Sequence, residues 1–375
     1  MSPVTSKTMV ACRWVSSKPN PVFETVPIPV PAADEVLIKV LAAGVCHSDL
    51  GMLTAGENIN MWLSATHTTP FTIGHEGAGI ICELGASAAS ASPIALTEGD
   101  YVAIWCGVHC QIPSCQSCPR GYTNLCSFGG LRGVKTDGTW AEYITIHASC
   151  VVPVPSGPER IPPAVVSAAT DAVLTPWHAM KTLCGVSPAH TVLCMGIGGL
   201  GLNGVGIAKR CLRARCVVAC DTRAGALEDA RAAGADHAAP PAELPALLAG
   251  QGLAVDFAFD FVGVQATFDA CCGAVRPGGT VHVVGLGADT LAYRPLALMA
   301  KDLTVRTSFW GTRAELAEVL QAVADGLLRP KAAVRPMSQC VEVLDDMRAG
   351  RLLARTALVP DGVLVAERQD VSPHL

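Results

Sequence analysis

The spacing of hydrophobic residues changes along this chain and separates it into two regions. Up to about residue 170, short alternating apolar and polar runs lie between turn signals, which predicts strands and loops, most clearly strands over 35–41 and 101–105. The small-residue tract 85–93 and the long stretch 53–70 lack this spacing, and we expect both to be irregular loops. The first region is therefore predicted to be mainly β.

A second rhythm begins near residue 171, where strand-length apolar runs alternate with helical patterns. The predicted strands cover 191–195, 215–220, 255–261, 280–284 and 303–307, and the predicted helices cover 202–211, 225–233, 265–272 and 314–324. Repeated strand–helix units imply a parallel sheet with right-handed crossovers. The expected fold class is α/β, with a mainly β domain formed by 1–171 and 313–375 and a doubly wound, Rossmann-type domain over 172–312.

A glycine turn follows the first predicted strand of the second region. Its G-x-G-x-x-G spacing lets a pyrophosphate approach the backbone at a helix N-terminus. Asp221, at the end of the next strand, is placed to hydrogen-bond an adenosine ribose. We therefore predict a dinucleotide site that prefers NAD to NADP; the alternative is a glycine-rich hairpin that binds no cofactor. The expected cofactor-binding residues here are Gly196, Gly198, Gly199, Leu200, Gly201 and Asp221.

Composition fits a two-domain protein of the cytoplasm. The length of 375 residues exceeds the roughly 250–300 at which single cores divide. A net charge of −5 without a basic cluster argues against nucleic acid and anionic membranes as partners. No secretory signal is visible, and the uncharged stretch 182–208 holds glycine, proline and asparagine, so we interpret it as a buried strand and helix. The 17 cysteines are then expected to be reduced thiols and metal ligands rather than disulfides.

Two clusters of residues have the chemistry of metal ligands. Cys46 and His75 stand in Gly-Val-Cys-His-Ser-Asp and Gly-His-Glu, and a thiolate with an imidazole suits a catalytic zinc that keeps one position open. Taken singly, each would more often be a core cysteine or a hydrogen-bonded loop histidine. Four further cysteines within seventeen residues predict a closed structural zinc site, with disulfides as the alternative and Cys106 as a competing ligand. They are Cys110, Cys115, Cys118 and Cys126.

These signals, in this order, resemble the zinc-dependent medium-chain alcohol dehydrogenases over about residues 36–355. The segment 74–85 resembles the family's zinc signature, and 44–49 resembles its first-ligand motif. The bacterial and fungal NAD-dependent branch, which includes secondary-alcohol dehydrogenases, is similar at 257–263, 283–286 and 309–313. The resemblance implies a GroES-like zinc-binding catalytic domain, a Rossmann NAD-binding domain, and hydride transfer between NAD and an alcohol or carbonyl compound.

Three positions depart from the family pattern. Asp171 stands where the family usually has a cysteine as its third catalytic-zinc ligand, so the expected ligands are Cys46, His75 and Asp171. The alternative is an acid that only hydrogen-bonds nearby. The first gap of the cysteine cluster holds four residues where two are usual, so the loop is expected to bulge. Gly51 stands where several members have the histidine that ends a proton relay, so another route must serve.

The resemblance also implies roles for single side chains around the zinc and the cofactor. Ser48 is expected to hydrogen-bond the alcohol oxygen and to pass its proton toward His47, and Glu76 is expected to orient the zinc from behind. His47 and Arg355 are expected at the cofactor pyrophosphate. The other expected cofactor residues are Thr175, near the nicotinamide, and Val262, Val284 and Trp310.

The family resemblance further implies two zincs per chain and a homodimer or homotetramer that assembles near 280–310. The expected substrate is an alcohol, most simply a secondary one, or its carbonyl counterpart, and a specialised biosynthetic substrate is equally compatible. Two other functions stay open: a zinc-free reductase of the same fold that acts on enones or quinones, and a non-catalytic cofactor-binding redox sensor. Cys46 and His75 argue against the first, and Ser48 beside the expected ligands argues against the second.

Overall fold

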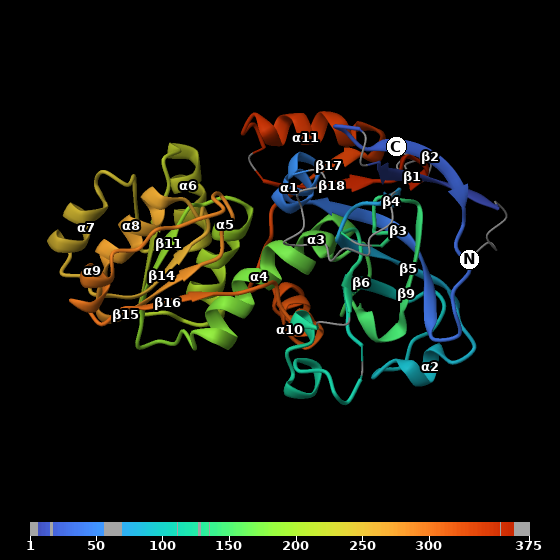
Figure 1. Cartoon of the computed structure of the whole chain (residues 1–375), viewed down its shortest axis with the longest axis horizontal. Coiled ribbons are helices and arrows are strands. Elements are labelled where there is room, and N and C mark those ends of the chain that lie inside the picture. Colours follow the sequence, from blue (N-terminus) through green and yellow to red (C-terminus); the bar gives the residue numbers. More distant parts are fainter. Residues whose placement is uncertain are drawn as a thin grey trace, which may run out of the picture. The chain divides into compact units, whose positions relative to one another are not determined.

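A computed structural model describes residues 7–15, 18–55, 70–110, 112–126, 129–134, 136–352 and 354–363. The chain forms two compact units, which Figure 1 colours along the sequence. Unit 1 comprises Met1–Asp171, Thr312–Gln321 and Lys331–Leu375, and unit 2 comprises Ala172–Gly311 and Ala322–Pro330. Most of the stretch 53–70, predicted as a loop, falls on residues 56–69 and lies outside the described residues.

Unit 1 is mainly β, as the alternation of its apolar residues predicts. Its larger sheet has the strand order β10-β6-β5-β3-β18-β17, with β9 paired to β3, and two smaller sheets have the orders β2-β1-β4 and β7-β8. The strand β6 is buried at every residue, which matches its continuous apolar sequence. The strands are β1 (Thr8–Trp14), β2 (Val22–Pro27), β3 (Glu35–Val45), β4 (Phe71–Thr72), β5 (Glu76–Leu84), β6 (Tyr101–Trp105), β7 (Gly107–Val108), β8 (Gly130–Leu131), β9 (Tyr143–His147), β10 (Val151–Pro153), β17 (Ala332–Pro336) and β18 (Arg355–Val359).

Helices accompany these sheets. They are α1 (His47–Ala55), α2 (Ala88–Ala91), α3 (Pro163–Ala168), α10 (Arg313–Ala324), whose last residues belong to unit 2, and α11 (Cys340–Arg348). The tract 85–93, predicted as an irregular loop, contains α2, because its alanines favour one helical turn even between serines. The helix α11 buries residues at the i, i+3, i+4, i+7 spacing of an apolar stripe, namely Cys340, Val343, Leu344 and Met347.

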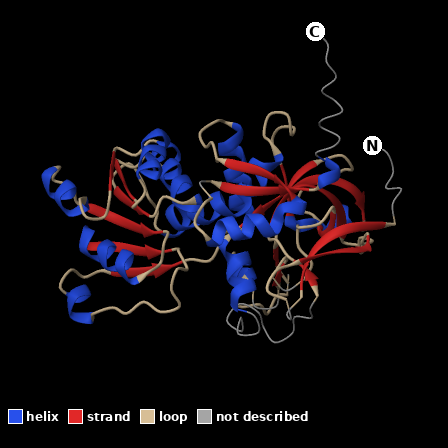
Figure 2. Ribbon diagram, turned by 90° about the horizontal axis from the view of Figure 1, so that it is seen from above, coloured by secondary structure: helices blue, strands red, loops and turns tan. Residues whose placement is uncertain are grey.

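Unit 2 is a six-stranded parallel sheet with the order β13-β12-β11-β14-β15-β16. Its strands are β11 (Thr191–Met195), β12 (Cys216–Cys220), β13 (His237–Ala239), β14 (Val255–Asp260), β15 (Val275–Val283) and β16 (Thr304–Thr307). The strands β11 and β12 are buried throughout, since helices cover a parallel sheet on both faces. Figure 2 shows helices on both sides of these strands. The order is that of a Rossmann sheet, which confirms the predicted fold class.

The helices of unit 2 are α4 (Leu174–Trp177), α5 (Gly199–Gly206), α6 (Ala224–Ala233), α7 (Leu244–Gly250), α8 (Gln265–Ala274) and α9 (Pro295–Met299). The helix predicted over 202–211 begins earlier, at Gly199, and becomes π-helical over Ile207–Cys211. The uncharged stretch 182–208 contains the strand β11 and the helix α5, as predicted. Among the described residues, no helix has both the length and the apolar character to cross a bilayer. Buried residues of the strands and helices form a hydrophobic core against the sheet, among them Leu193, Val218, Val255, Phe268 and Val281.

Candidate active site

Four side chains with metal-ligand chemistry come together in unit 1. Ligand atoms of Cys46, His75, Glu76 and Asp171 all lie within 4.8 Å of one another. Cys46 stands between β3 and α1, whereas His75 and Glu76 stand at the start of β5. Asp171 lies in the π-helical segment Ala169–Val173, a local distortion that often occurs at functional sites. The three expected zinc ligands therefore lie together in space, and Glu76 lies with them.

Asp49 positions both Cys46 and His75, a role that the sequence did not bring out. Its Oδ2 accepts a hydrogen bond of 2.8 Å from the backbone N–H of Cys46, and its Oδ1 lies 3.0 Å from Nδ1 of His75. The first contact is half of a capping box, because Cys46 precedes α1 and Asp49 is the third residue of that helix. The second contact fixes the imidazole, as carboxylates behind metal-binding histidines do. Burial opposes charge on His75, but Asp49 and Cys46 raise its pKa well above the usual value.

Arg355 pairs with both carboxylates of this site. Its Nε lies 3.2 Å from Oε2 of Glu76, and its Nη2 contacts both Glu76 and Asp171. Burial raises the pKa of Glu76 to about 8, although the positive charge of Arg355 opposes that rise. The guanidinium is buried, with Arg355 only 6% exposed. The structure thus places Arg355 against the metal-site carboxylates, while its expected contact with pyrophosphate stays a prediction.

Gly44 leaves the space that Glu76 occupies. A Cβ at Gly44 would lie 1.9 Å from Oε2 of Glu76, far inside any real contact distance. The carbonyl of Gly44 accepts a 3.0 Å hydrogen bond from Nε1 of Trp140, and Oγ1 of Thr139 donates to the carbonyl of Glu76 at 2.7 Å. These bonds hold β3 and β5 at a spacing that admits the buried carboxylate. The glycine of the first-ligand motif therefore has a steric reason.

The donor set fits zinc. Thiolate, imidazole and carboxylate are the ligands that zinc takes in proteins, with bonds of about 2.0–2.3 Å. Sγ of Cys46 lies 3.2 Å from Oδ2 of Asp171, and Nε2 of His75 lies 4.0 Å from the same oxygen. One zinc ion with bonds of that length can therefore contact Cys46, His75 and Asp171 together. Buried anionic groups this close to one another also need a cation or a proton to offset their charge.

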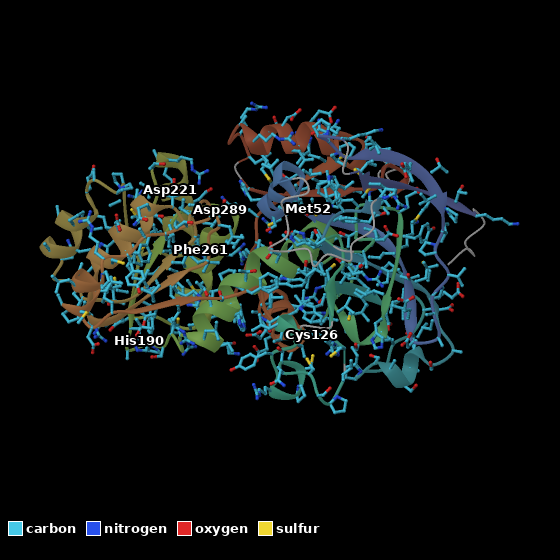
Figure 3. All side chains as sticks on the ribbon, in the orientation of Figure 1. Met52, Cys126, His190, Asp221, Phe261 and Asp289 are labelled. Atoms are coloured by element: carbon cyan, nitrogen blue, oxygen red, sulfur yellow. The ribbon has the colours of Figure 1, made fainter. Side chains whose placement is uncertain are left out.

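Four cysteine sulfurs form a second candidate metal site in unit 1. They belong to Cys110, Cys115, Cys118 and Cys126 and lie within 4.8 Å of one another. Backbone N–H groups point at them: that of Cys110 donates to Sγ of Cys126 at 3.3 Å, and that of Gly129 donates to the same sulfur at 3.2 Å. Figure 3 labels Cys126 and draws sulfur in yellow. The N–H groups of Cys118 and Ser117 lower the pKa of Cys115 to about 6, which favours the thiolate that zinc binds.

The four sulfurs converge although the first gap of the cluster is longer than the family's. Of that gap, Gln111 lies outside the described residues. Cys106, the competing ligand candidate, is not among the converging donors of the described chain. Its thiol is fully buried, and burial raises its pKa to about 12, so it remains protonated. The set of four cysteines is therefore sufficient for a closed tetrahedral site.

Ser48 and His47 begin α1 directly after Cys46. Oγ of Ser48 lies 3.6 Å from Sγ of Cys46, and the residue is exposed. His47 is exposed, yet desolvation by its neighbours and the positive charge of Arg355 lower its pKa, so the ring is neutral near pH 7 and can accept a proton. A Cβ at Gly51 would meet no atom of the described residues within 4 Å, so nothing in that part of the chain fills the position where the family resemblance would place a relay histidine.

The glycine turn of unit 2 has the geometry that a dinucleotide site needs. Gly196 has φ +85°, a left-handed conformation that favours glycine. A Cβ at Gly201 would lie 1.8 Å from the carbonyl oxygen of Gly196, so only glycine lets α5 pack this close. Gly198 precedes α5, and a Cβ there would meet no atom of the described chain within 4 Å. Gly199 and Leu200 open the helix, so their N–H groups stand at its positive end.

Asp221 closes this turn from the end of β12; Figure 3 labels it. Its Oδ2 accepts a 2.7 Å hydrogen bond from the N–H of Ile197 within the turn, and its Oδ1 accepts from Nε of Arg223 at 3.1 Å. Burial alone would raise the pKa of Asp221, but the hydrogen bonds from Arg223 and Ile197 lower it. The residue is therefore ionised near neutral pH and can accept a hydrogen bond from a ribose.

The other expected cofactor residues fall at strand ends or in buried positions. Val262 follows β14 and Val284 follows β15, so both lie at the carboxyl edge of the sheet, where the turn after β11 also lies. Thr175 lies in α4 and Trp310 follows β16, and both are buried. Trp310 has φ +54°, which is unusual for a bulky side chain. Cofactor contacts of these four residues stay predictions.

Two protein-family models match this chain. Residues 32–156 match the alcohol dehydrogenase GroES-like domain, and residues 199–325 match the zinc-binding dehydrogenase family. The first range holds Cys46, His75, Glu76 and the four-cysteine cluster, and the second begins in the glycine turn. The chain belongs to the zinc-containing medium-chain alcohol dehydrogenase family.

Proteins with known names or structures align with nearly the whole chain. An NAD-dependent alcohol dehydrogenase of Sulfurisphaera tokodaii is 28% identical over 351 residues, which cover 90% of this chain and 96% of the relative. The structure of acetophenone reductase from Geotrichum candidum in complex with NAD is 29% identical, with a TM-score of 0.80 and coverage of 95% and 98%. The alcohol dehydrogenase from Aeropyrum pernix is 26% identical, with a TM-score of 0.82 and coverage of 94% and 100%.

Membership in the family confirms several predictions from the sequence. The two family models confirm the GroES-like and Rossmann parts and the enzyme class, which is that of the zinc-containing alcohol dehydrogenases. Together with the two groups of metal-ligand side chains, they also confirm zinc as a cofactor. NAD, the other predicted cofactor, agrees with the names of two of the relatives.

Proposed function

We propose that this protein uses NAD and zinc to interconvert a secondary alcohol and its ketone. The observation that carries the proposal is the convergence of Cys46, His75, Glu76 and Asp171 within 4.8 Å in a member of this family. The preference for secondary alcohols is supported by Asp171 at the third ligand position, where some secondary-alcohol members of the family look alike. It is also supported by similarity to a reductase of acetophenone, which is a ketone. The enone-reductase alternative lacks support, because the complete donor set is present in the described residues.

Cys46, His75 and Asp171 would hold the catalytic zinc, with Glu76 behind them, and the four-cysteine cluster would hold a structural zinc. When bound, zinc supplies Lewis-acid chemistry that lowers the pKa of an alcohol hydroxyl or polarises a carbonyl group. Asp49 keeps the imidazole of His75 in a fixed orientation through the 3.0 Å contact at Nδ1. Arg355 contacts the carboxyl groups of both Glu76 and Asp171, so these side chains stay in place.

The remaining side chains handle the proton and the cofactor. Ser48 accepts a hydrogen bond from the substrate hydroxyl, and the proton of that hydroxyl passes through Ser48 toward neutral His47. This route serves in place of the relay histidine, because Gly51 stands at that position. In unit 2, the N–H groups at the start of α5 hold the pyrophosphate of NAD. Asp221 accepts hydrogen bonds from the adenosine ribose and repels the 2′-phosphate of NADP.

Matched alcohol isomers test the substrate class. The purified zinc-loaded enzyme is assayed with NAD and either 1-phenylethanol or 2-phenylethanol, and with either 2-propanol or 1-propanol. We expect kcat/KM to be about tenfold or more higher for the secondary isomer of each pair, a difference of about 1.4 kcal/mol in transition-state binding. Equal or higher efficiency with the primary isomers would overturn the substrate class. Reduction of cyclohexenone at its carbon–carbon double bond, without alcohol oxidation, would overturn the reaction itself.

We also propose that the sheet edge of unit 2 joins two copies of this chain. The edge strand β16 is exposed at all four residues, and Val305 within it is 42% exposed. Leu296 and Met299 of α9 are 79% and 74% exposed. An open edge with apolar neighbours pairs readily with another strand. Light scattering should show a dimer or tetramer that Val305→Lys shifts toward the monomer; a monomeric wild type would overturn the proposal.

A further inference from the structure

Two buried cysteines lie in contact in unit 1, outside both groups of zinc ligands. Sγ of Cys12 and Sγ of Cys340 are 3.2 Å apart, and both residues are 0% exposed. Cys12 lies in β1, and Cys340 is the first residue of α11, 328 positions later. Figure 1 shows β1 and α11 near each other at the same end of unit 1. The strand β1 and the helix α11 therefore meet at two thiols.

We propose that Cys12 and Cys340 form a disulfide when the protein meets a peroxide, so that a covalent bond ties β1 to α11. Neither residue takes part in the zinc or cofactor sites described above. The proposal therefore adds an oxidative modification site to the protein and does not depend on its substrate.

The geometry favours this bond because little has to move. A disulfide has an S–S length of about 2.05 Å, so the sulfurs must approach by about 1.1 Å. The backbone of Cys12 is held on both sides: its N–H donates to the carbonyl of Trp140 at 2.8 Å, and its carbonyl accepts from the N–H of Ile73 at 3.3 Å. Side-chain rotation at the two cysteines can supply the approach while these hydrogen bonds stay in place.

The chemistry balances with hydrogen peroxide as the oxidant. The sulfur of Cys340 attacks one peroxide oxygen, the O–O bond breaks, and Cys340 becomes a sulfenic acid with release of one water. The sulfur of Cys12 then attacks the sulfenic sulfur, the S–O bond breaks, and the proton of Cys12 leaves with the oxygen as a second water. Two thiols and one peroxide thus give one disulfide and two waters.

The order of the two steps follows from the surroundings of each thiol. The thiol contact with Cys340 and burial raise the pKa of Cys12 above its usual value, which disfavours loss of its proton. Cys340 stands at the N-terminal end of α11, where the helix dipole favours the negative charge that develops on an attacking sulfur. We therefore assign Cys340 as the sulfur that is oxidised first and Cys12 as the sulfur that resolves the sulfenic acid.

Peptide mapping of the oxidised native protein tests the proposal. The zinc-loaded protein is treated with hydrogen peroxide, free thiols are alkylated, and the protein is digested and analysed by mass spectrometry without reduction. We expect a linked pair of peptides containing Cys12 and Cys340, lighter by two hydrogens than their sum and separated by dithiothreitol. Separately alkylated Cys12 and Cys340 peptides after oxidation, or a link that appears only in denatured protein, would overturn the proposal.

Stability gives a second readout with a matched control. The bond closes nearly the whole chain into one loop, so oxidation should raise Tm by about 5 °C or more in the wild type and speed migration on a non-reducing gel. Cys12→Ala and Cys340→Ala should each abolish both effects. Cys194→Ala, which removes another fully buried thiol in β11, should retain them. Equal shifts in all four proteins would assign the effect to other cysteines and overturn the proposal.

Discussion

Oδ1 of Asp49 lies 3.0 Å from Nδ1 of His75, while Nε2 of the same ring faces Asp171 at 4.0 Å. The carboxylate of Asp49 therefore fixes the imidazole at Nδ1. The carboxylate of Asp171 lies near Nε2, the nitrogen that faces the candidate metal position. Asp49 is buried and also accepts from the N–H of Cys46, so it couples two ligands that stand 29 residues apart in the sequence.

Asp49→Ala should weaken zinc binding at the catalytic site by about 10–100-fold, because the imidazole loses its fixed orientation and part of its basicity. Competition with a chromophoric chelator measures the affinity. Ser48→Ala is the matched control, since it lies in the same helix and should reduce turnover without changing zinc affinity. An Asp49→Ala protein with unchanged zinc affinity would show that Asp49 has only a structural capping role.

Gly44→Ala should displace the Glu76 side chain, because the new Cβ would lie 1.9 Å from Oε2. We expect a loss of about 1–3 kcal/mol in the free energy of unfolding, typical of overpacking in a buried site, together with reduced activity. Urea unfolding and an alcohol oxidation assay measure the two effects. Gly51→Ala adds the same methyl group where no described residue lies within 4 Å, and it should be tolerated. Equal stability of both variants would contradict the role of Gly44.

Asp221→Ser should shift cofactor preference toward NADP. The basic partner that a 2′-phosphate needs is already present, since Nε of Arg223 lies 3.1 Å from Oδ1 of Asp221. We expect kcat/KM for NADP to rise by about tenfold and that for NAD to fall, as each 1.4 kcal/mol is one factor of ten. A second change, Arg223→Ala, should remove the gain. Equal efficiency of the wild type with NAD and NADP would contradict the assignment of Asp221.

The sequence predicted the framework better than the support around the ligands. Continuous apolar runs such as 191–195 belong to buried parallel strands, so β11 has the predicted bounds. The glycine spacing located the turn because a side chain at Gly196 or Gly201 would clash with neighbouring atoms. The role of Asp49 was missed, although an acid three residues after Cys46 is the pattern of a capping box. The pairing of Arg355 with Glu76 and Asp171 depends on β18 lying beside β3 in the sheet, a long-range contact that local spacing does not encode.

Acid should destabilise the protein through His282. This residue is fully buried in β15, and burial, with Arg306 and His178, lowers its pKa from 6.5 to about 4. Above pH 6.5 the ring is neutral in both the folded and the unfolded chain, so it does not affect the free energy of unfolding. Below pH 6.5 only the unfolded chain binds the proton, so the free energy of unfolding falls until about pH 4. Between pH 7 and pH 5, the wild type should lose about 2 kcal/mol more than His282→Gln in urea unfolding. Parallel losses in the two proteins would contradict the lowered pKa.

The zinc content per chain, measured on protein purified without chelators, tests the proposed catalytic centre most directly. We expect two zincs in the wild type, and one zinc with no alcohol oxidation in Asp171→Ala, because the four-cysteine site keeps its metal. Asp171→Cys, which supplies the ligand usual in the family, should keep two. One zinc in the wild type, unchanged by Asp171→Ala, would contradict a catalytic zinc at Cys46, His75 and Asp171.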